Sequence, residues 1–164
     1  MSMEPPASKD TAALRAWRDA TFYRLLLRAS TAERVATLDG LRERGYTDVS
    51  QADTALLANL DAGGTTMSAL ARRTGVTRQA VSKQVALLQQ EGYVDREPDP
   101  ADSRAVLVLR TGKGEQLLRD ALDIVAAIEA DYRAHLGAER ADELKKLLAD
   151  LLRLSDPGGG LGHD

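Results

Sequence analysis

The stretch that most constrains this chain covers residues 65–109, TTMSALARRTGVTRQAVSKQVALLQQEGYVDREPDPADSRAVLVL. At its centre, residues 77–90 are good helix formers, with Thr77 at the N-cap position and Gly92 just past the end. At about 100° per residue, one arc of this helix is apolar and the opposite arc is polar. The apolar arc, which we expect to pack, holds Ala80, Val81, Val85, Leu87 and Leu88, and the polar arc holds Arg78, Gln79, Ser82, Lys83, Ala86 and Gln90. Basic and amide side chains without a carboxylate suit phosphates and base edges.

A shorter helix precedes this one. Thr66 can cap residues 67–73, whose Leu70 and Ala71 point inward, and Gly75 then supplies a tight turn. The pattern predicts a helix-turn-helix.

Two strand-like segments follow, at residues 93–97 and 105–109, the second with alternating side chains. Pro98 and Pro100 stiffen the charged loop between them, which is typical of a hairpin with a solvent-exposed tip. A helix-turn-helix followed by such a hairpin predicts a winged helix. The expected fold class is mainly α with a small β-hairpin wing, in which a winged helix-turn-helix is attached to a helical dimerisation body.

The distribution of charge supports a nucleic-acid partner although the net charge is −3. Residues 65–90 contain four of the 22 basic residues and none of the 25 acidic ones. Because local charge matters more than the total, this window can face a polyanion.

Several phrases of the sequence resemble the MarR-type (multiple antibiotic resistance regulator) winged-helix transcription regulators. They span residues 66–114, and the departures Ala69, Thr74 and Ser103 are small. The matching phrases are LARR (70–73) leading into Gly75-Val76, RQAVSK (78–83), EGYV (91–94), and the wing from Asp99-Pro100 through Asp102, Arg104, Val106 and Leu109-Arg110-Thr111 to Gly114.

The candidate DNA-binding residues lie on the two helices and the wing. We expect Gln79, Ser82 and Lys83 to face bases of a major-groove half-site, with Arg78 near the backbone. The candidates with phosphate or supporting roles are Arg72, Arg73 and Thr77. For both arginines the alternative is a solvated helix end, and Gln84, at the edge of the packing arc, is interpreted as structural or peripheral.

Arg104 on the wing has two compatible interpretations. It can pair with Asp102 and stabilise the hairpin. The resemblance implies instead that Arg104 contacts the minor groove or the backbone, while Asp102 holds the guanidinium in place.

The flanking segments divide the chain into five parts. Residues 1–9 are predicted to be a disordered leader, 10–45 an N-terminal dimerisation helix or helices, 46–111 the winged helix-turn-helix lobe, 112–154 C-terminal dimerisation helices, and 155–164 a disordered tail. Ser30 and Glu33 form a capping-box pattern, so the first segment is either broken at Ser30 or one helix kinked there. Ser50 can cap a helix whose Ala55, Leu56 and Leu60 face inward.

The C-terminal segments carry more apolar surface than one chain can cover. The residues are Leu118, Ala121, Val125, Ile128, Tyr132 and His135 on one predicted helix, and Leu144, Leu147, Leu148, Leu151 and Leu152 on the next. Their three- and four-residue spacing is typical of a packed helix face. A second subunit is the expected cover.

Composition removes several function classes. The chain has no cysteine, which excludes disulfides, thiolate metal sites and thiol-based redox switching. Its two histidines, His135 and His163, show no metal-ligand spacing, so neither a metal nor a cofactor is expected. No apolar run approaches the ~20 residues of a membrane span, and the N-terminus lacks a signal-peptide core, so a cytoplasmic location is expected. The sequence shows neither a nucleophile paired with a base nor a glycine-rich phosphate loop, so it does not indicate an enzyme.

The sequence thus predicts a homodimeric, DNA-binding transcription regulator, a repressor of a pseudo-palindromic operator. The resemblance implies release by a small aromatic or amphipathic effector between the body and the DNA lobe. Trp17, Tyr23 and Tyr132 are candidates for lining such a pocket, with core or dimer packing the favoured alternative. The alternative functions are a dimeric winged-helix module that binds protein, and a constitutive DNA binder without an effector.

Overall fold

The computed structural model describes residues 10–102 and 104–155 of the 164-residue chain. These residues form seven helices and one small antiparallel sheet, so the mainly α, winged-helix fold class is confirmed. The elements are α1 (Thr11–Asp19), α2 (Phe22–Glu43), α3 (Gln51–Ala58), β1 (Thr65–Thr66), α4 (Met67–Thr74), α5 (Arg78–Gln90), β2 (Val94–Pro98), β3 (Val106–Arg110), α6 (Gly112–Leu136) and α7 (Ala138–Ser155). The predicted leader, and the tail with His163, fall on residues 1–9 and 156–164, outside the described part.

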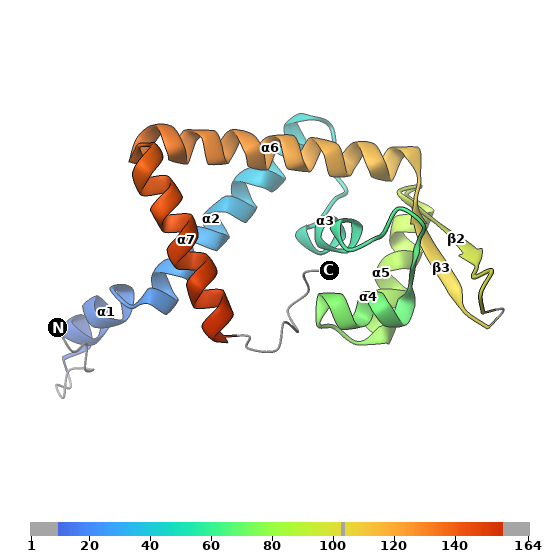
Figure 1. Cartoon of the computed structure of the whole chain (residues 1–164), viewed down its shortest axis with the longest axis horizontal. Coiled ribbons are helices and arrows are strands. Elements are labelled where there is room, and N and C mark those ends of the chain that lie inside the picture. The colour runs from blue at the N-terminus through green and yellow to red at the C-terminus, as the bar shows by residue number, and fades with distance from the viewer. Residues whose placement is uncertain (1–9, 103, 156–164) are drawn as a thin grey trace.

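The chain forms two regions (Figure 1). The winged-helix lobe comprises α3 to β3, and the helical body comprises α1, α2, α6 and α7. Helix α6 extends along the top of the view, with the wing at one end and α7 at the other.

The core of the lobe is built from one buried side of each of its helices. Leu56 and Leu57 of α3 pack in one cluster with Leu70 of α4 and with Val81 and Val85 of α5. Together with the sheet, this cluster holds α5 by one face and leaves its other faces outside.

The sheet has the order β1-β3-β2, with every neighbouring pair antiparallel. In β2 and β3, Val94 lies opposite Arg110 and Pro98 opposite Val106, which gives the predicted hairpin. The sequence did not predict β1, a two-residue strand in which Thr65 pairs with Val108. This strand fixes the start of α4 to the wing.

Local sequence signals set the ends of the helix-turn-helix as predicted. The Thr66 and Thr77 hydroxyls accept hydrogen bonds from Ala69 N and Ala80 N, at 3.3 and 3.2 Å. Gly75 ends α4 with φ +69°, a left-handed conformation that glycine adopts without steric cost.

The N-terminal segment breaks at a different place from the one predicted. Helix α1 ends at Asp19 and α2 begins after Thr21, whose hydroxyl accepts from Arg24 N at 3.2 Å. Ser30 lies inside α2, so the capping box and the helix break predicted there are wrong. A Ser-x-x-Glu pattern forms a cap only where the backbone leaves the helix, and here Ser30 Oγ instead accepts a bond from Arg34 one turn later.

Two predicted packing faces are corrected by burial. On α5, Val81, Val85 and Leu88 are buried as predicted, but Ala80 and Leu87 are exposed. The lobe covers α5 from one side only, so the buried stripe is narrower than the apolar arc. On α3, Ala55 is exposed, while Leu57, which was not predicted to face inward, is buried beside Leu56.

Polar contacts attach the lobe to the body through α6. Arg110 at the end of β3 donates to the carbonyl oxygens of Leu57, at 2.9 Å, and Leu60, and pairs with Glu115 of α6 at 2.8 Å. The Leu57 carbonyl belongs to the last turn of α3, where helix carbonyls lack intrahelical partners, and Leu60 lies just past the end of this helix. Gly114 lies so close to the Tyr93 carbonyl oxygen that a Cβ would collide with it.

Within the body, α2 and α6 are joined just past the C-terminal end of α2. Tyr46 donates to Asp120 Oδ2 at 2.6 Å and Arg44 pairs with Asp120 Oδ1 at 2.8 Å. Burial and the nearby Asp120 carboxylate raise the pKa of Tyr46 to about 12, so the phenol remains a donor at neutral pH.

Candidate nucleic-acid interface

The polar arc of α5 lies on the surface of the lobe. Arg78, Gln79, Ser82 and Lys83, all predicted as DNA contacts, are exposed, and they occupy the first half of the helix. Helical geometry places residues four apart on one side, so Gln79 and Lys83 project together. The structure therefore presents an acid-free set of donors and acceptors where a groove-reading helix needs it.

Thr77 begins this surface and has a structural task. Its hydroxyl accepts from Ala80 N, which fixes the first turn of α5. The Thr77 side chain is exposed, and its observed role is to cap the N-terminus of α5.

The two arginines at the end of α4 differ. Arg72 is exposed. Arg73 donates from Nη1 to Asp61 Oδ2 and to the Asn59 carbonyl oxygen, both at 2.9 Å, and its side chain is 29% exposed. Arg73 thus holds the α3–β1 connection against α4, so it is not the merely solvated helix end that was the alternative interpretation.

The contact between Arg73 and Asp61 is an ion pair, with 2.9 Å between Nη1 and Oδ2. The hydrogen bond from Arg73, followed by one from Thr65, lowers the pKa of the Asp61 carboxyl below its usual value. The ionised carboxylate neutralises Arg73, which leaves Arg72, Arg78 and Lys83 as the basic groups of the helix-turn-helix surface.

The tip of the wing is organised by two aspartates. Asp99 Oδ1 accepts from Ala101 N at 2.8 Å, and Asp102 Oδ1 accepts from the backbone N–H of Arg104 at 3.0 Å. The predicted pairing of Asp102 with the Arg104 guanidinium is therefore corrected: Asp102 fixes the backbone of the turn. Among the described residues, the exposed Arg104 side chain makes no ion pair.

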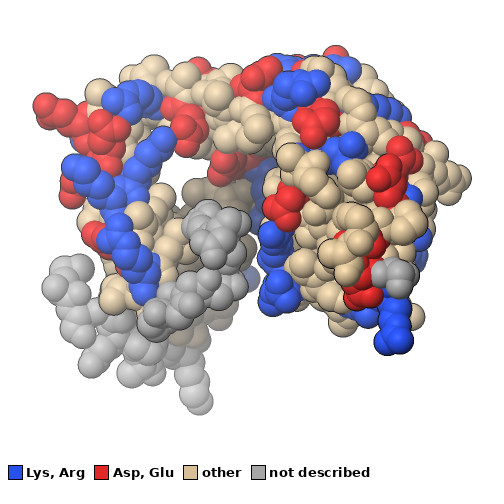
Figure 2. All heavy atoms as spheres, turned by 45° about the vertical axis from the view of Figure 1, so that its right-hand side comes forward, with Lys and Arg blue, Asp and Glu red and all other residues tan. Residues whose placement is uncertain are grey.

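The surface carries both signs of charge (Figure 2). Basic side chains lie at the lower end of the lobe and along the edge that borders the hollow between lobe and body, while acidic side chains are scattered over the face turned to the viewer. A net negative protein can thus offer a basic edge to a polyanion.

Two supporting residues were not identified from the sequence as parts of this interface. Arg110 fixes β3 to α3, and Gln84 of α5 donates to Asp53 of α3 at 3.2 Å. Gln84 was predicted to be structural or peripheral, which this contact confirms. No signal in the sequence indicates either partner, because each contact joins residues far apart in the chain.

Neither a metal-binding cluster nor a membrane-spanning helix is found among the described residues. In the described residues no three His, Asp or Glu side chains lie close enough together to hold a metal ion. None of the helices described is long and apolar enough to cross a bilayer. His135, in the last turn of α6, is exposed.

Fold and surface together define a winged helix-turn-helix DNA-binding protein. Residues 47–105 match the model of the MarR family. The chain is 31% identical over 102 residues to an HTH-type transcriptional regulator of Mycobacterium leprae. This match covers 62% of this chain and 71% of that protein. The chain belongs to the MarR family of DNA-binding transcription regulators, as its sequence predicted, and this family assignment separates it from the enzymes.

Solved structures share the fold. The transcriptional repressor CouR bound to a 23-mer DNA duplex superimposes with a TM-score of 0.69 at 23% identity, over 90% of this chain and 100% of that one. CouR from Rhodococcus jostii RHA1 bound to p-coumaroyl-CoA gives a TM-score of 0.67 at 23% identity, over 82% and 91%.

Proposed function

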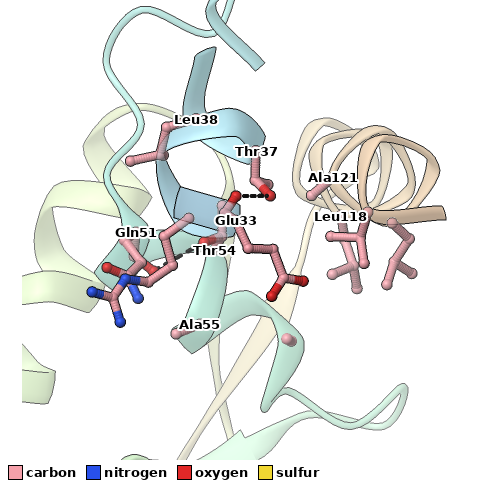
Figure 3. A pocket seen from close by; sticks show the side chains of 12 residues that line it. Glu33, Thr37, Leu38, Gln51, Thr54, Ala55, Leu118 and Ala121 are labelled. Atoms are coloured by element: carbon pink, nitrogen blue, oxygen red, sulfur yellow. Dashed lines mark hydrogen bonds between the residues drawn. The ribbon is translucent and has the colours of Figure 1, made fainter. Parts of the chain in front are cut away.

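We propose that this chain is a repressor that binds a pseudo-palindromic operator as a homodimer and is released by a small amphipathic molecule. The observation that carries the proposal is a cavity of about 320 Å³ between the body and the lobe (Figure 3). An occupant there touches both regions at once.

The chemistry of the cavity favours an amphipathic ligand. Its α6 wall is apolar, with Leu118, Ala121 and Val125, while Glu33 and Arg34 of α2 supply charges at the other side. A volume near the lower end of the roughly 300–1,000 Å³ range of small-molecule pockets suits a ligand about the size of one substituted ring. CouR, which has been solved bound to a DNA duplex and bound to p-coumaroyl-CoA, supports both the DNA-binding and the ligand-binding part of the proposal.

The predicted aromatic lining is not part of this cavity. Its lining residues come from α2, α3 and α6 and include neither Trp17 nor Tyr23. Tyr132 lines a different hollow of about 550 Å³ between α2, α6 and α7. We assign that hollow and the exposed Tyr23 to the side of the body that a second subunit covers.

A homodimer is supported by uncovered apolar side chains on the body. They are Leu14, Phe22, Tyr23, Leu25, Leu26, Leu144, Leu147, Leu151, Leu152 and Leu154, from α1, α2 and α7. Exposed apolar patches of this kind mark interfaces, and self-association of one chain is most often two-fold. A two-fold dimer would carry two α5 helices to two half-sites.

We assign sequence choice to Gln79 and Lys83. Glutamine can pair with both edge atoms of adenine and lysine can donate to guanine acceptors, with about 1–3 kcal/mol of discrimination for each good pair. We assign Arg72 and Arg78 to the phosphate backbone. Arg104 is assigned to the phosphate backbone or the minor groove.

The test is selection from a randomised duplex library with the wild type, Q79A and K83A, followed by footprinting on the promoter beside the gene. We expect an inverted repeat for the wild type and relaxed preference at one or two positions per half-site for each variant. The same motif at lower affinity for both variants would mean that these side chains touch only phosphates.

Two alternatives have distinct outcomes in the same experiments. A protein-binding module would select no duplex at any salt concentration, whereas DNA affinity should fall steeply with rising salt. A constitutive binder would also select an operator, but a panel of phenolic acids and their thioesters would not release the protein from it.

A further inference from the structure

One side-chain hydrogen bond joins α3, a helix that lines the cavity, to α5, the helix assigned to reading DNA. Gln84 Nε2 donates to Asp53 Oδ1 at 3.2 Å, and both side chains are partly buried. The bond is polar, directional and shielded on one side from water.

Asp53 is also fixed to the first turn of α3. Its other oxygen, Oδ2, accepts from Ser50 N at 2.9 Å and from Ser50 Oγ at 2.5 Å, which closes a capping box. The carboxylate therefore moves with this turn as one unit, while its oxygen Oδ1 accepts the hydrogen bond from Gln84.

The same turn of α3 borders the cavity. Gln51 and Thr54, on either side of Asp53 in the sequence, line it, and Ala55 follows on the next turn (Figure 3). An occupant that presses on α3 from the α6 side displaces the capping turn, and with it the Asp53 carboxylate.

The remaining contacts between α3 and α5 transmit such a movement less strictly. Leu56 and Leu57 share a core cluster with Val81 and Val85, and apolar contacts have no preferred direction, so the helices can slide on them. A hydrogen bond weakens steeply once its angle is lost. Movement of α3 therefore either carries α5 with it through Gln84 or breaks the bond.

We propose that Gln84 is the positioning residue through which the cavity controls the orientation of the recognition helix. This inference rests on the proposed function, because it assumes that DNA binding responds to the cavity. Gln84 follows Lys83 directly, on the side of α5 turned toward α3, so it acts on the groove-reading face from behind.

The experiment uses a side chain as the cavity occupant, because the natural ligand is unidentified. Ala55→Phe places a ring at the cavity wall. Operator affinity is measured by fluorescence anisotropy for the wild type, A55F, Q84M and A55F/Q84M, with thermal unfolding as the check of folding. Methionine keeps the length of glutamine and removes the donor.

We expect A55F to weaken operator binding in the wild-type background and to weaken it about three- to tenfold less in the Q84M background. This factor is the net contribution of a single hydrogen bond expressed as an affinity ratio. The matched control is Q89A, on an exposed glutamine of the same helix, for which the cycle with A55F should be additive.

A rescue distinguishes positioning from simple packing. Q84E places a second carboxylate opposite Asp53 and should uncouple the cavity from α5, as Q84M does. Q84E therefore replaces Q84M in the test if Q84M does not fold. D53N/Q84E restores a bond with donor and acceptor exchanged, and should recover the sensitivity to A55F.

Additive effects of A55F and Q84M would overturn the inference, as would operator binding that A55F leaves unchanged. Failure of the proposed function is recognised separately, because the wild-type protein itself would then bind no operator.

Discussion

The lobe and the body bury their apolar residues to very different extents. Leu57, Leu70 and Val85 of the lobe are completely buried, whereas Leu147 and Leu154 on α7 of the body are 52% and 78% exposed. The lobe, with the adjoining Leu41 of α2 and Leu117 of α6, forms a closed hydrophobic core within one chain. The body has an apolar face that one chain does not cover, and this difference supports a division of labour between binding DNA and binding a second copy.

Polar contacts link distant elements in both regions. In the lobe, Arg73 and Arg110 bridge elements distant in sequence, and in the body Arg44 pairs with Asp120 of α6. Other pairs of the body, such as Arg42 with Asp39 and Arg153 with Asp150, lie within one helical turn on exposed surface. Exposed pairs of this kind contribute little, so they do not compensate for the uncovered leucines.

The largest expected effect is on the closed core of the lobe. Leu57→Ala should lower the free energy of unfolding by about 2–5 kcal/mol, because a buried leucine is replaced by a cavity. Leu87→Ala, on a half-exposed leucine of α5, is the control and should cost far less. Urea unfolding followed by circular dichroism measures both, and equal losses would remove the contrast between closed and open surface.

The second prediction concerns the open face of the body. L147E/L151E should produce a monomer in sedimentation experiments and weaken operator binding by roughly two orders of magnitude, because two linked half-site contacts become independent. Lys146→Glu changes the net charge by the same amount at an exposed neighbouring position and should remain dimeric. A dimeric L147E/L151E would contradict the assigned interface.

The third prediction separates two arginines of the lobe. Arg104→Ala should weaken binding to all sequences evenly and lower the salt slope by about one unit, because its exposed side chain is assigned to a phosphate. Arg73→Met should reduce stability and leave the salt slope unchanged, since Asp61 already neutralises Arg73. Titrations of DNA at several salt concentrations test both, and a shifted base preference in R104A would argue against a positional role.

The smallest effect is a dependence of stability on acid. Hydrogen bonds from Arg73, Arg110 and Tyr46, respectively, lower the pKa values of Asp61, Glu115 and Asp120. A carboxylate with a lowered pKa stabilises the fold above its unfolded pKa, near 4, and loses this contribution as the pH falls through its folded pKa. The melting temperature should therefore fall below about pH 4, and less steeply for D61N; equal slopes would remove Asp61 from the cause.

The sequence predicted well where structure depends on neighbours in the chain. Thr66 and Thr77 cap their helices and Gly75 turns the chain as expected, because each signal and its effect lie within one turn. The same local rule failed at Ser30, where a capping pattern lies inside a continuous helix. A cap requires the backbone to leave the helix, and the sequence of α2 gives it no reason to do so there.

Contacts between distant elements could not be predicted. The engagement of Arg73 by Asp61, and of Gln84 by Asp53, depends on how α3 packs against α4 and α5, which no local pattern encodes. The exposure of Leu87 has the same origin, since hydrophobic spacing shows which arc can pack but not how much of it a neighbour covers.

The central claim is that two copies of α5 read two half-sites of one operator from the same face of the duplex. Affinity for the selected operator, measured as base pairs are inserted between its half-sites, tests this claim most directly. The account predicts that an insertion of about 5 base pairs, half a helical turn, abolishes tight binding, because the half-sites then face opposite sides of the DNA. Affinity that does not depend on the spacing would contradict it.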